Sequence, residues 1–455
     1  MTFTNKLSCY NQQFKTTHIC LALSFLVLTC THSLAQGINK KPNIILIMAD
    51  DMGFECLGVN GSLSYQTPVL DKLAENGMRF TKCISQPVCT PSRVKIMTGK
   101  YNYRNYVDFG YLDKNEKTFG NMMKGAGYKT MIAGKWQLSG AKEKREGFND
   151  MERPNQFGFD EYCLWQLTKK GPRFANPFLE QNGKLLETTI DDYGPDIVSD
   201  YILDFVDRNK EEPFFVYYPM ILVHSPFVPT PDSPEWKNPE TRSNRGNKYF
   251  ADMVNYSDKI VGKIMDKLKD LNIDDNTIVI FTGDNGTHTN ITSQTISGAY
   301  PGGKSSMPDN GTHVPMIVHW PAGKQKGVEI NELIEFSDFM PTLAEAAGTK
   351  SFTTDGQSFF KSLSGQEKPP RETAFVHYHP YTNKVRPKDG RFVRNLEYKL
   401  YHDGRFYFIP EDKWEKTSLD YSSLTSAQKK IYKKLKAEMD SQPVYDFTVS
   451  IVNEK

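Results

Sequence analysis

Two pairs of oxygen-bearing side chains each follow an apolar run of strand length. Asp50 and Asp51 come directly after one run, and Asp284 and Asn285 come shortly after another. Carboxylate and amide oxygens suit calcium or magnesium and do not suit zinc. Adjacent acids are also common in turns and helix caps, but two pairs at equivalent strand ends favour a site for a divalent cation.

One cysteine lies in the turn-like stretch VCTPSR, residues 88–93. Taken alone, the Cys89 thiol could be a structural group, half of a disulfide, a nucleophile or the precursor of another group. Four cysteines follow residue 35, too few for a disulfide scaffold, and no C-x-x-C spacing indicates zinc. These four are Cys56, Cys83, Cys89 and Cys163.

The first 35 residues have the composition of a leader. They contain two lysines, no acid, the apolar run 19–28 and small residues near its end. This order predicts a secretory signal peptide over 1–35, and hence a secreted or periplasmic protein. The apolar run is too short for a membrane span. Cys30 could instead carry a lipid, but Thr29 is larger than the residue usual before a lipidated cysteine, so we favour cleavage.

The charge of the remaining chain is balanced. Without the two leader lysines, 54 basic residues face 54 acidic ones. A chain near neutrality gives no general reason to expect nucleic acid or a membrane surface as partner, and no later stretch is long and apolar enough to span a bilayer. Anion binding must therefore depend on local cations.

Buried strands alternate with amphipathic helices over most of the chain. Continuous apolar runs predict strands buried on both faces, and helical spacing with proline starts or glycine stops predicts helices. The expected fold is α/β, a mostly parallel central sheet sandwiched by helices, with ligands at the carboxyl ends of the strands. The expected strands are 43–48, 131–133, 213–218 and 277–281, and the expected helices are 68–76, 250–271 and 339–348.

The pattern changes after about Gly365. Short strands follow one another closely, with turn residues between them, and a charged helix follows. This predicts a small antiparallel sheet with one helix. The expected elements are strands 373–378, 391–394, 398–402 and 405–409 and a helix over 426–441. The predicted organisation is a signal peptide at 1–35, a catalytic domain at 36–364 and an α+β subdomain at 365–455.

The residues around Cys89 fit a family signature. The stretch CTPSR matches C-x-P-x-R and is followed by TGKY. Over residues 41–356, further motifs appear in the order KPNIILIMADDMG, AGKW, HSP, FTGDNG, GGK and VPMIVHWPAG. This ordered set resembles the sulfatase family, the formylglycine-dependent type I sulfatases of the alkaline phosphatase superfamily. The resemblance implies an alkaline phosphatase-like fold and a sulfuric ester hydrolase.

The resemblance also implies a role for Cys89. In such enzymes the signature cysteine is oxidised to formylglycine, an aldehyde whose hydrate supplies the nucleophilic oxygen. Pro91 and Arg93 belong to the motif that the maturation enzyme reads on the unfolded chain, so that enzyme is an expected partner. The implied cation is calcium, with magnesium as the alternative, and its implied ligands are Asp50, Asp51, Asp284, Asn285 and the residue formed from Cys89.

The resemblance implies further catalytic residues, and the charge of the implied substrate is consistent with them. A sulfate monoester is an anion, so an attacking oxygen needs local positive charge, which Arg93, Lys135 and Lys304 are placed to supply. His224, in HSP, occupies the position where the family has a histidine near the ester oxygen. The pKa of a histidine can be set near neutrality, which suits a proton donor to the leaving alkoxide.

Two departures from the family pattern affect the expected substrate contacts. Relatives usually have G-K-W-H-x-G, in which the histidine helps to expel sulfate, whereas this chain has Gln137, which cannot act as a base. We expect another group to take that role, with His288 the candidate. Relatives often have Y-E-G-G-x-R where this chain has MPDNGTH, and His313 is expected to take the space of the arginine.

Other functions stay open at this point. A phosphonate or phosphate diester hydrolase of the same superfamily can carry the same signature, and loss of the base at Gln137 could leave a noncatalytic binder of sulfated glycans. Export favours a sulfated carbohydrate as the substrate. Tyr162, Trp165, Trp136 and Trp236 could form a sugar-stacking wall, although aromatic stretches are more often core.

Overall fold

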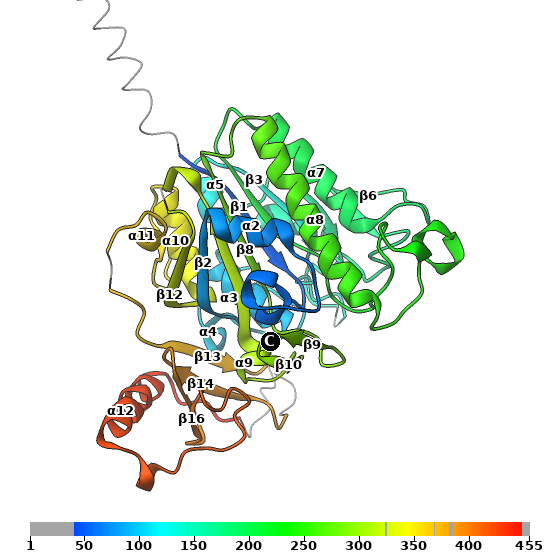
Figure 1. The fold of residues 1–455 in the computed structure, drawn as a ribbon. Coiled ribbons are helices and arrows are strands. Elements are labelled where there is room, and N and C mark those ends of the chain that lie inside the picture. Colours follow the sequence, from blue (N-terminus) through cyan, green and yellow to red (C-terminus); the bar gives the residue numbers. More distant parts are fainter. Residues whose placement is uncertain (1–40, 143, 324, 368, 382–385, 448–455) are drawn as a thin grey trace, which may run out of the picture. The chain divides into compact units, whose positions relative to one another are not determined.

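The computed structural model describes residues 41–142, 144–323, 325–367, 369–381 and 386–447 (Figure 1). From Pro42 onward the chain forms one compact unit. The predicted signal peptide over 1–35 and the alternative lipidation site at Cys30 lie outside the described residues. In the part that is described, no helix is long and apolar enough to cross a membrane.

A ten-stranded sheet forms the centre of the unit, in the order β12-β2-β11-β8-β1-β7-β3-β4-β5-β6. β1 pairs in parallel with β7 and β8, and β3 pairs in parallel with β7 and β4. The strands are β1 Asn43–Ala49, β2 Met78–Ile84, β3 Lys129–Lys135, β4 Glu161–Trp165, β5 Leu179–Gln181, β6 Lys184–Leu185, β7 Phe214–Pro219, β8 Thr277–Gly283, β11 His313–His319 and β12 Val328–Glu335.

Alternate side chains of β1 enter two different cores. Ile45 and Ile47 belong to one hydrophobic cluster, and Ile44 and Leu46 belong to the other, all without solvent exposure. Helices cover both faces, so the predicted sandwich is confirmed (Figure 1). The first face carries α2 Pro68–Asn76, α7 Gly194–Arg208 and α8 Tyr249–Asp270; the second carries α3 Cys89–Thr98, α5 Phe119–Gly125, α10 Phe339–Ala346 and α11 Phe360–Leu363.

The sheet is parallel at its centre and mixed toward its edges. After β8 the chain stays at the carboxyl end of the strands, where it forms the hairpin of β9 Thr292–Thr295 and β10 Gly298–Pro301 and the short helix α9 Asp309–Thr312. The next strand, β11, must therefore run back, and it pairs antiparallel with both β8 and β2. Two further short helices, α4 Asn102–Asn105 and α6 Arg153–Gln156, and several 3₁₀ turns such as Phe336–Asp338 complete the described helices.

A separate four-stranded antiparallel sheet follows, as the sequence predicts. One of its faces packs on α12 through Leu435, and the other contacts Val88 and Cys89 at the start of α3. Its elements are β13 Ala374–Tyr378, β14 Gly390–Arg394, β15 Tyr398–Tyr401, β16 Phe406–Phe408 and α12 Ser426–Ser441. The domain boundary at residue 365 stays a prediction.

Candidate active site

The carboxyl ends of β1 and β8 bring the two predicted oxygen pairs together. The two strands are parallel neighbours with Ala49 opposite Gly283, so the residues after them meet. The backbone N–H of Asp51 donates to Asp284 Oδ1 at 2.9 Å, and Asn285 Nδ2 donates to Asp51 Oδ1 at 2.9 Å. All four side chains, including Asp50, are fully buried. The sheet topology thus builds the acidic cluster that the sequence predicts.

Three cations from separate elements pair with the three carboxylates. Burial raises the pKa of Asp50 and Asp51, but the neighbouring cations outweigh burial and hold the pKa of both below the usual value. Burial and the charge of Asp50 raise the pKa of Asp284 to about 7. The pairs are Arg93 with Asp284 at 2.9 Å, Lys135 with Asp50 at 2.7 Å and Lys304 with Asp51 at 2.6 Å.

Cys89 is the first residue of α3 and faces this cluster. Val88 before it is extended, and Gly99 ends the helix with φ 67°, a left-handed conformation that glycine adopts without strain. The Cys89 thiol donates to Oε1 of Gln137 at 3.3 Å. Burial raises the pKa of Cys89, against the opposing effect of Lys135, so the thiol is not an activated thiolate.

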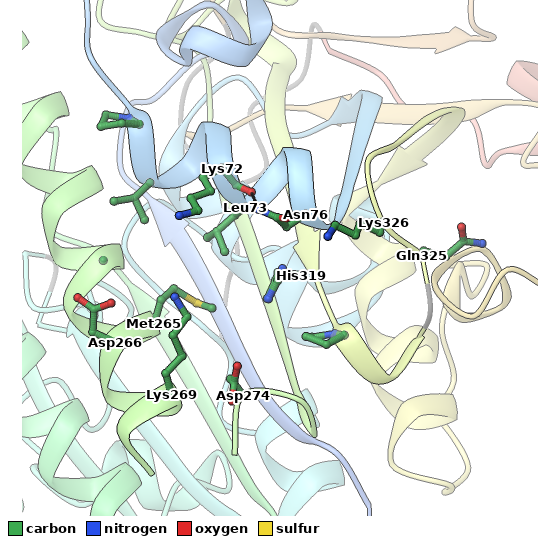
Figure 2. Close-up of a pocket in the computed structure, with 14 residues that line it drawn as sticks. Lys72, Leu73, Asn76, Met265, Asp266, Lys269, Asp274, His319, Gln325 and Lys326 are labelled. Carbon is green, nitrogen blue, oxygen red and sulfur yellow. Dashed lines mark hydrogen bonds between the residues drawn. The ribbon is translucent and has the colours of Figure 1, made fainter. Parts of the chain in front are cut away.

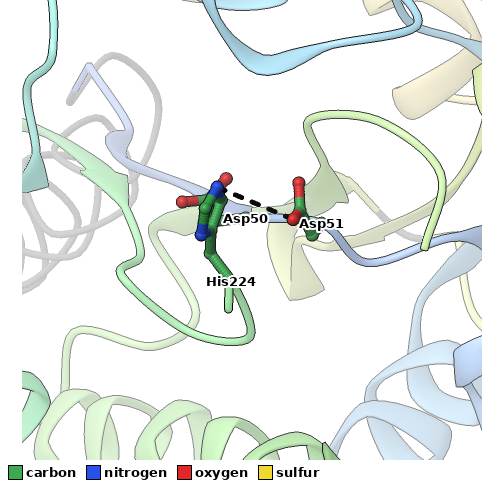
Figure 3. A group of neighbouring side chains, drawn as sticks. All are labelled: Asp50, Asp51 and His224. Atoms are coloured by element: carbon green, nitrogen blue, oxygen red, sulfur yellow. Dashed lines mark ion pairs between the residues drawn. The ribbon is translucent and has the colours of Figure 1, made fainter. Parts of the chain in front are cut away.

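His224 lies at the edge of the cluster, beside Asp51 (Figure 3). Its Nε2 is 3.8 Å from Asp51 Oδ2. Its Nδ1 is 2.6 Å from the carbonyl oxygen of Ser225, which can only accept, so Nδ1 carries the proton. Burial lowers the pKa of His224 to about 3, and the two aspartates only partly oppose that effect. Nε2 therefore has a free lone pair when the ring is neutral.

Comparison with known proteins decides what this cluster belongs to. The family model described as Sulfatase matches residues 42–349, which is more than half of the chain. The chain belongs to the sulfatase family. A second model, N-sulphoglucosamine sulphohydrolase, C-terminal, matches residues 303–442. The resemblance seen in the motifs is therefore confirmed, and as a sulfatase the protein is a sulfuric ester hydrolase.

Relatives of this sulfatase include enzymes named for carbohydrate substrates. An N-acetylgalactosamine-6-O-sulfatase of Bacteroides thetaiotaomicron is 30% identical over 411 residues, covering 73% of this chain and 78% of its own. An arylsulfatase of Hemicentrotus pulcherrimus is 30% identical over 366 residues, and this chain covers 64% of its length. The crystal structure of Ps i-CgsB superposes with a TM-score of 0.73 at 26% identity, covering 88% of this chain and 92% of the other.

The acidic cluster of this sulfatase fits a hard divalent cation. Asp50 Oδ1 and Asn285 Oδ1 are buried and have no hydrogen-bond partner. Asp50, Asp51 and His224 also offer ligand atoms that lie within 4.8 Å of one another. A buried polar atom without a partner is costly, so these oxygens are better satisfied when a ligand binds between them.

The other two predicted histidines lie in different places. His288 is half-buried near the cluster, where burial lowers its pKa and Asp51 opposes that effect; its Nδ1 accepts the N–H of Asn290 at 3.1 Å. His313 faces away: its Nε2 is 2.9 Å from the Thr81 carbonyl and its ring stacks on Phe54 at 4.1 Å. The structure thus brings His288 to the site and keeps His313 apart from it.

Two cavities differ in their relation to the cluster. One of about 780 Å³ lies between α2, α8 and the end of β11, where Lys72, Lys269 and His319 point inward (Figure 2). His319 pairs with Val279 at the start of β8, so this cavity lies at the opposite end of the strands from Asp284. Another cavity, of about 750 Å³, includes His224 in its lining and adjoins the active site.

The predicted aromatic wall is mostly core. Trp136 and Trp165 are each 1% exposed, and Tyr162 is equally buried, because β3 and β4 lie inside a sheet covered on both faces. Trp165 instead supports Arg173, whose guanidinium carbon is 3.9 Å from the centre of its ring. Arg173 lines the cavity beside His224 and was not expected from the sequence, in which no motif surrounds it.

Proposed function

We propose that this sulfatase hydrolyses a sulfate ester of a carbohydrate, with formylglycine formed from Cys89 as the nucleophile and calcium as the cation. The observation that carries the proposal is the convergence of Cys89, four oxygen-bearing side chains and three cations at one end of β1 and β8. A raised thiol pKa suits a precursor better than a working thiolate.

The cation would be held by Asp50, Asp51, Asp284, Asn285 and residue 89, with magnesium as the alternative ion. The two unpartnered oxygens, on Asp50 and Asn285, support this ligand set. When bound, the cation supplies Lewis acidity toward the sulfate oxygens and favours an ionised nucleophile. Since Lys135 and Lys304 pair with the aspartates in this structure, we expect binding of the cation to release both ammonium groups toward the sulfate.

Arg93, Lys135 and Lys304 would stabilise the charge of the sulfate during attack. Arg93 is held for this role because its Nη2 pairs with Asp284 and its Nη1 donates to the Lys135 carbonyl at 3.2 Å. The ester oxygen leaves as an alcohol and needs a proton, which we assign to Nε2 of His224. That atom faces the cluster, while Nδ1 is fixed by the Ser225 carbonyl. Because Nε2 of the neutral ring carries no proton, His224 must first be protonated, and we expect the negative charge of the bound sulfate ester to favour this by raising the pKa of the ring.

Residue 89 must then release sulfate, and Gln137 contacts it without being able to take a proton. We propose His288 as the substitute base. In the structure its Nδ1 accepts from Asn290, so the turn that contains both residues must open, or the tautomer must change, before His288 can act. A His288→Ala variant that keeps full turnover would exclude this role.

The carbohydrate substrate is supported by the relative named for N-acetylgalactosamine-6-O-sulfate and by the leader over 1–35, which suits export to the periplasm or the medium. The relative rates of sulfate release from sulfated sugars and of hydrolysis of phosphodiesters separate this proposal from a phosphoester hydrolase. Faster phosphodiester hydrolysis would contradict it, and tight binding of a sulfated sugar without any release of sulfate would indicate a noncatalytic binder.

The state of residue 89 is the first test. Mass spectrometry of the tryptic peptide 83–93, from protein made in its native host, should show an aldehyde or its hydrate at this position. An unchanged thiol in that host would remove the covalent mechanism.

The role of His224 has a separate test. His224→Gln should slow hydrolysis of a sugar sulfate by about 10²-fold or more, because the alkoxide then leaves without its proton donor. Hydrolysis of 4-nitrophenyl sulfate, whose leaving group needs no proton, should fall far less. Equal losses on both substrates would assign His224 to metal binding or structure instead.

A further inference from the structure

The cavity that adjoins the active site is strongly cationic. Its volume is about 750 Å³, and no aspartate or glutamate is among its lining residues. It is formed by loops around residues 170–176, 224–228 and 242–245. Its lining includes His224 and four cations, Lys170, Arg173, Arg242 and Arg245. A ligand that fills this cavity therefore meets positive charge on several sides.

Arg173 is the buried cation of the cavity that is left without a full set of partners. The residue is only 7% exposed, and its Nη1 has no hydrogen-bond partner. Burial lowers the pKa of Arg173 to about 10, with Asp50 and Asp51 opposing that effect, so the group is charged at neutral pH. An incompletely paired guanidinium at such a depth is unfavourable unless a ligand completes its hydrogen bonds.

The position of Arg173 is fixed from two sides. Its guanidinium lies over the ring of Trp165, an arrangement that favours a cation. Its backbone is held by close approach of Gly194, where any Cβ would lie 2.1 Å from the Arg173 carbonyl oxygen. The side chain is thus held in place before any ligand arrives.

The other cations of the cavity differ from Arg173. Arg242 donates to the carbonyls of Trp236 at 2.7 Å and Ile190 at 3.1 Å, and also pairs with Asp191. Its donors are used to connect loops. Lys170 and Arg245 are exposed at the rim. Among the lining residues, Arg173 is therefore the buried donor available to a ligand.

We infer that this cavity binds a second anionic group of the substrate, a sulfate or a carboxylate, through Arg173. This inference deepens the proposed function and rests on it, because the cavity shares His224 with the site of ester hydrolysis. The planar fork of arginine matches both groups by paired hydrogen bonds. The substrate is then a carbohydrate with at least two anionic groups, and Arg173 selects it over one that carries only the reacting sulfate.

The test compares binding of paired saccharides that differ by one anionic group. Calorimetry uses the Cys89→Ala chain, which prevents turnover, with or without Arg173→Met. Methionine keeps an apolar side chain over Trp165 and removes the charge. The matched control is Lys169→Met, which removes a cation that lies over the Phe178 ring in the same loop, outside the lining of the cavity. Arg173→Lys keeps the positive charge. If it also keeps binding, the loss in Arg173→Met comes from the missing charge and not from a failure of any variant at this position to fold.

Three pairs of probes separate the two sources of negative charge. Glucosamine 2-N,6-O-disulfate against N-acetylglucosamine 6-O-sulfate, and ι-neocarrabiose against κ-neocarrabiose, test a second sulfate. A chondroitin 6-sulfate disaccharide against N-acetylgalactosamine 6-sulfate tests a carboxylate. We expect the more charged member of at least one pair to bind about tenfold or more tightly. Arg173→Met should reduce that preference below threefold, Arg173→Lys should keep part of it, and Lys169→Met should keep all of it.

Two results would overturn the inference: no charge preference in any pair, including no binding at all, or a preference that survives in Arg173→Met. Failure of the proposed function would look different. In that case matured wild-type protein would release no sulfate from any of these probes, while the charge preference in binding would persist.

Discussion

Two buried clusters of charge in this sulfatase are built from similar residues and differ in completeness. Around Asp309, Arg394 Nη1 donates to Oδ1 at 2.6 Å, and Lys399 donates to the Met307 carbonyl and to Glu415, each at 2.7 Å. No side-chain atom of these four charged residues is buried without a partner in the described structure. This cluster, which ties α9 to the C-terminal sheet, is closed.

The cluster at the ends of β1 and β8 is open by the same measure. Asp50 Oδ1 and Asn285 Oδ1 lack hydrogen-bond partners, although Arg93 Nη2 lies 3.7 Å from Asp50 Oδ1, and Nη1 of Arg173 in the adjoining cavity also lacks one. Each such atom costs about 1–3 kcal/mol of folding free energy. The difference teaches that buried charge alone does not mark a site. A ligand can complete the partners of the open cluster but has none to complete in the closed one, and mutations in the two clusters should therefore have different consequences.

The largest effect should come from the nucleophile position of the open cluster. Cys89→Ala should lower kcat for sulfate release by about 10⁴-fold or more, because no oxygen nucleophile can then form. The matched control is Cys163→Ala, which removes an equally buried thiol in β4 and should keep turnover. Retention of more than a tenth of the activity in Cys89→Ala would contradict the covalent mechanism.

The next effect should come from the cation ligands. Asp50→Asn should lower kcat/KM by about 10³-fold, since one charge of the cation site is lost. A chelator should have a similar effect on the wild type, and added calcium should restore the wild type but not the variant. A wild-type enzyme that works fully after exhaustive chelation would show that the open cluster does not require a metal.

A mutation in the closed cluster should lower the stability of the fold, and this loss should not depend on the metal. Asp309→Asn leaves Arg394 and Lys399 without their shared anion, so the free energy of unfolding should fall by about 3 kcal/mol or more in urea titrations. Burial raises the pKa of Asp309, but Arg394 and Lys399 outweigh it and hold that pKa well below the usual value. The difference from wild type should therefore be full above about pH 4 and shrink only in stronger acid. If added calcium restored the free energy of unfolding of Asp309→Asn, the closed cluster would not be purely structural.

The smallest effect should come from His313, beside the closed cluster. Burial lowers its pKa to about 3, with Lys82 acting in the same direction, so the ring is neutral in the fold and takes a proton near pH 6.5 when unfolded. Stability should fall as the pH drops from 6.5 toward 3. Between pH 6.5 and 5, wild type should lose roughly 1.5 kcal/mol more than His313→Gln in parallel denaturation curves. Identical pH profiles would show that His313 is already charged in the fold.

The pattern of apolar residues in the sequence predicts the helices that expose one face to solvent and the strands that are buried in the sheet. The expected helix over 250–271 is found at Tyr249–Asp270, and the expected strand over 43–48 at Asn43–Ala49. The helix α3 shows no amphipathic pattern because all ten of its residues are buried. The sequence therefore reveals the C-x-P-x-R motif in this segment but does not predict that the segment is a helix.

The active site also contains residues that the sequence predicts and residues that it does not. Asp50 and Asp284 could be paired from the sequence because the ends of neighbouring parallel strands meet. Arg173 could not be found this way, because its role depends on the Trp165 ring, on Gly194 and on a cavity built by three distant loops. His313 was expected to take the space of the family's arginine because of its place in the motif, but its ring stacks on Phe54 and lines another pocket.

The packing of the C-terminal sheet against Cys89 has a consequence for the order of events during synthesis. Val376 and Tyr378 of β13 share a hydrophobic cluster with Cys89, and they leave the ribosome long after it. At roughly 5–20 residues per second, the roughly 290 residues between them take about 15 to 60 s to translate. We expect this delay to keep residue 89 open to its maturation enzyme, and a nascent chain stalled before β13 should react with a thiol reagent at Cys89 faster than the finished protein. Once the strands of the C-terminal sheet are made and pack against residue 89, the maturation enzyme would no longer reach it.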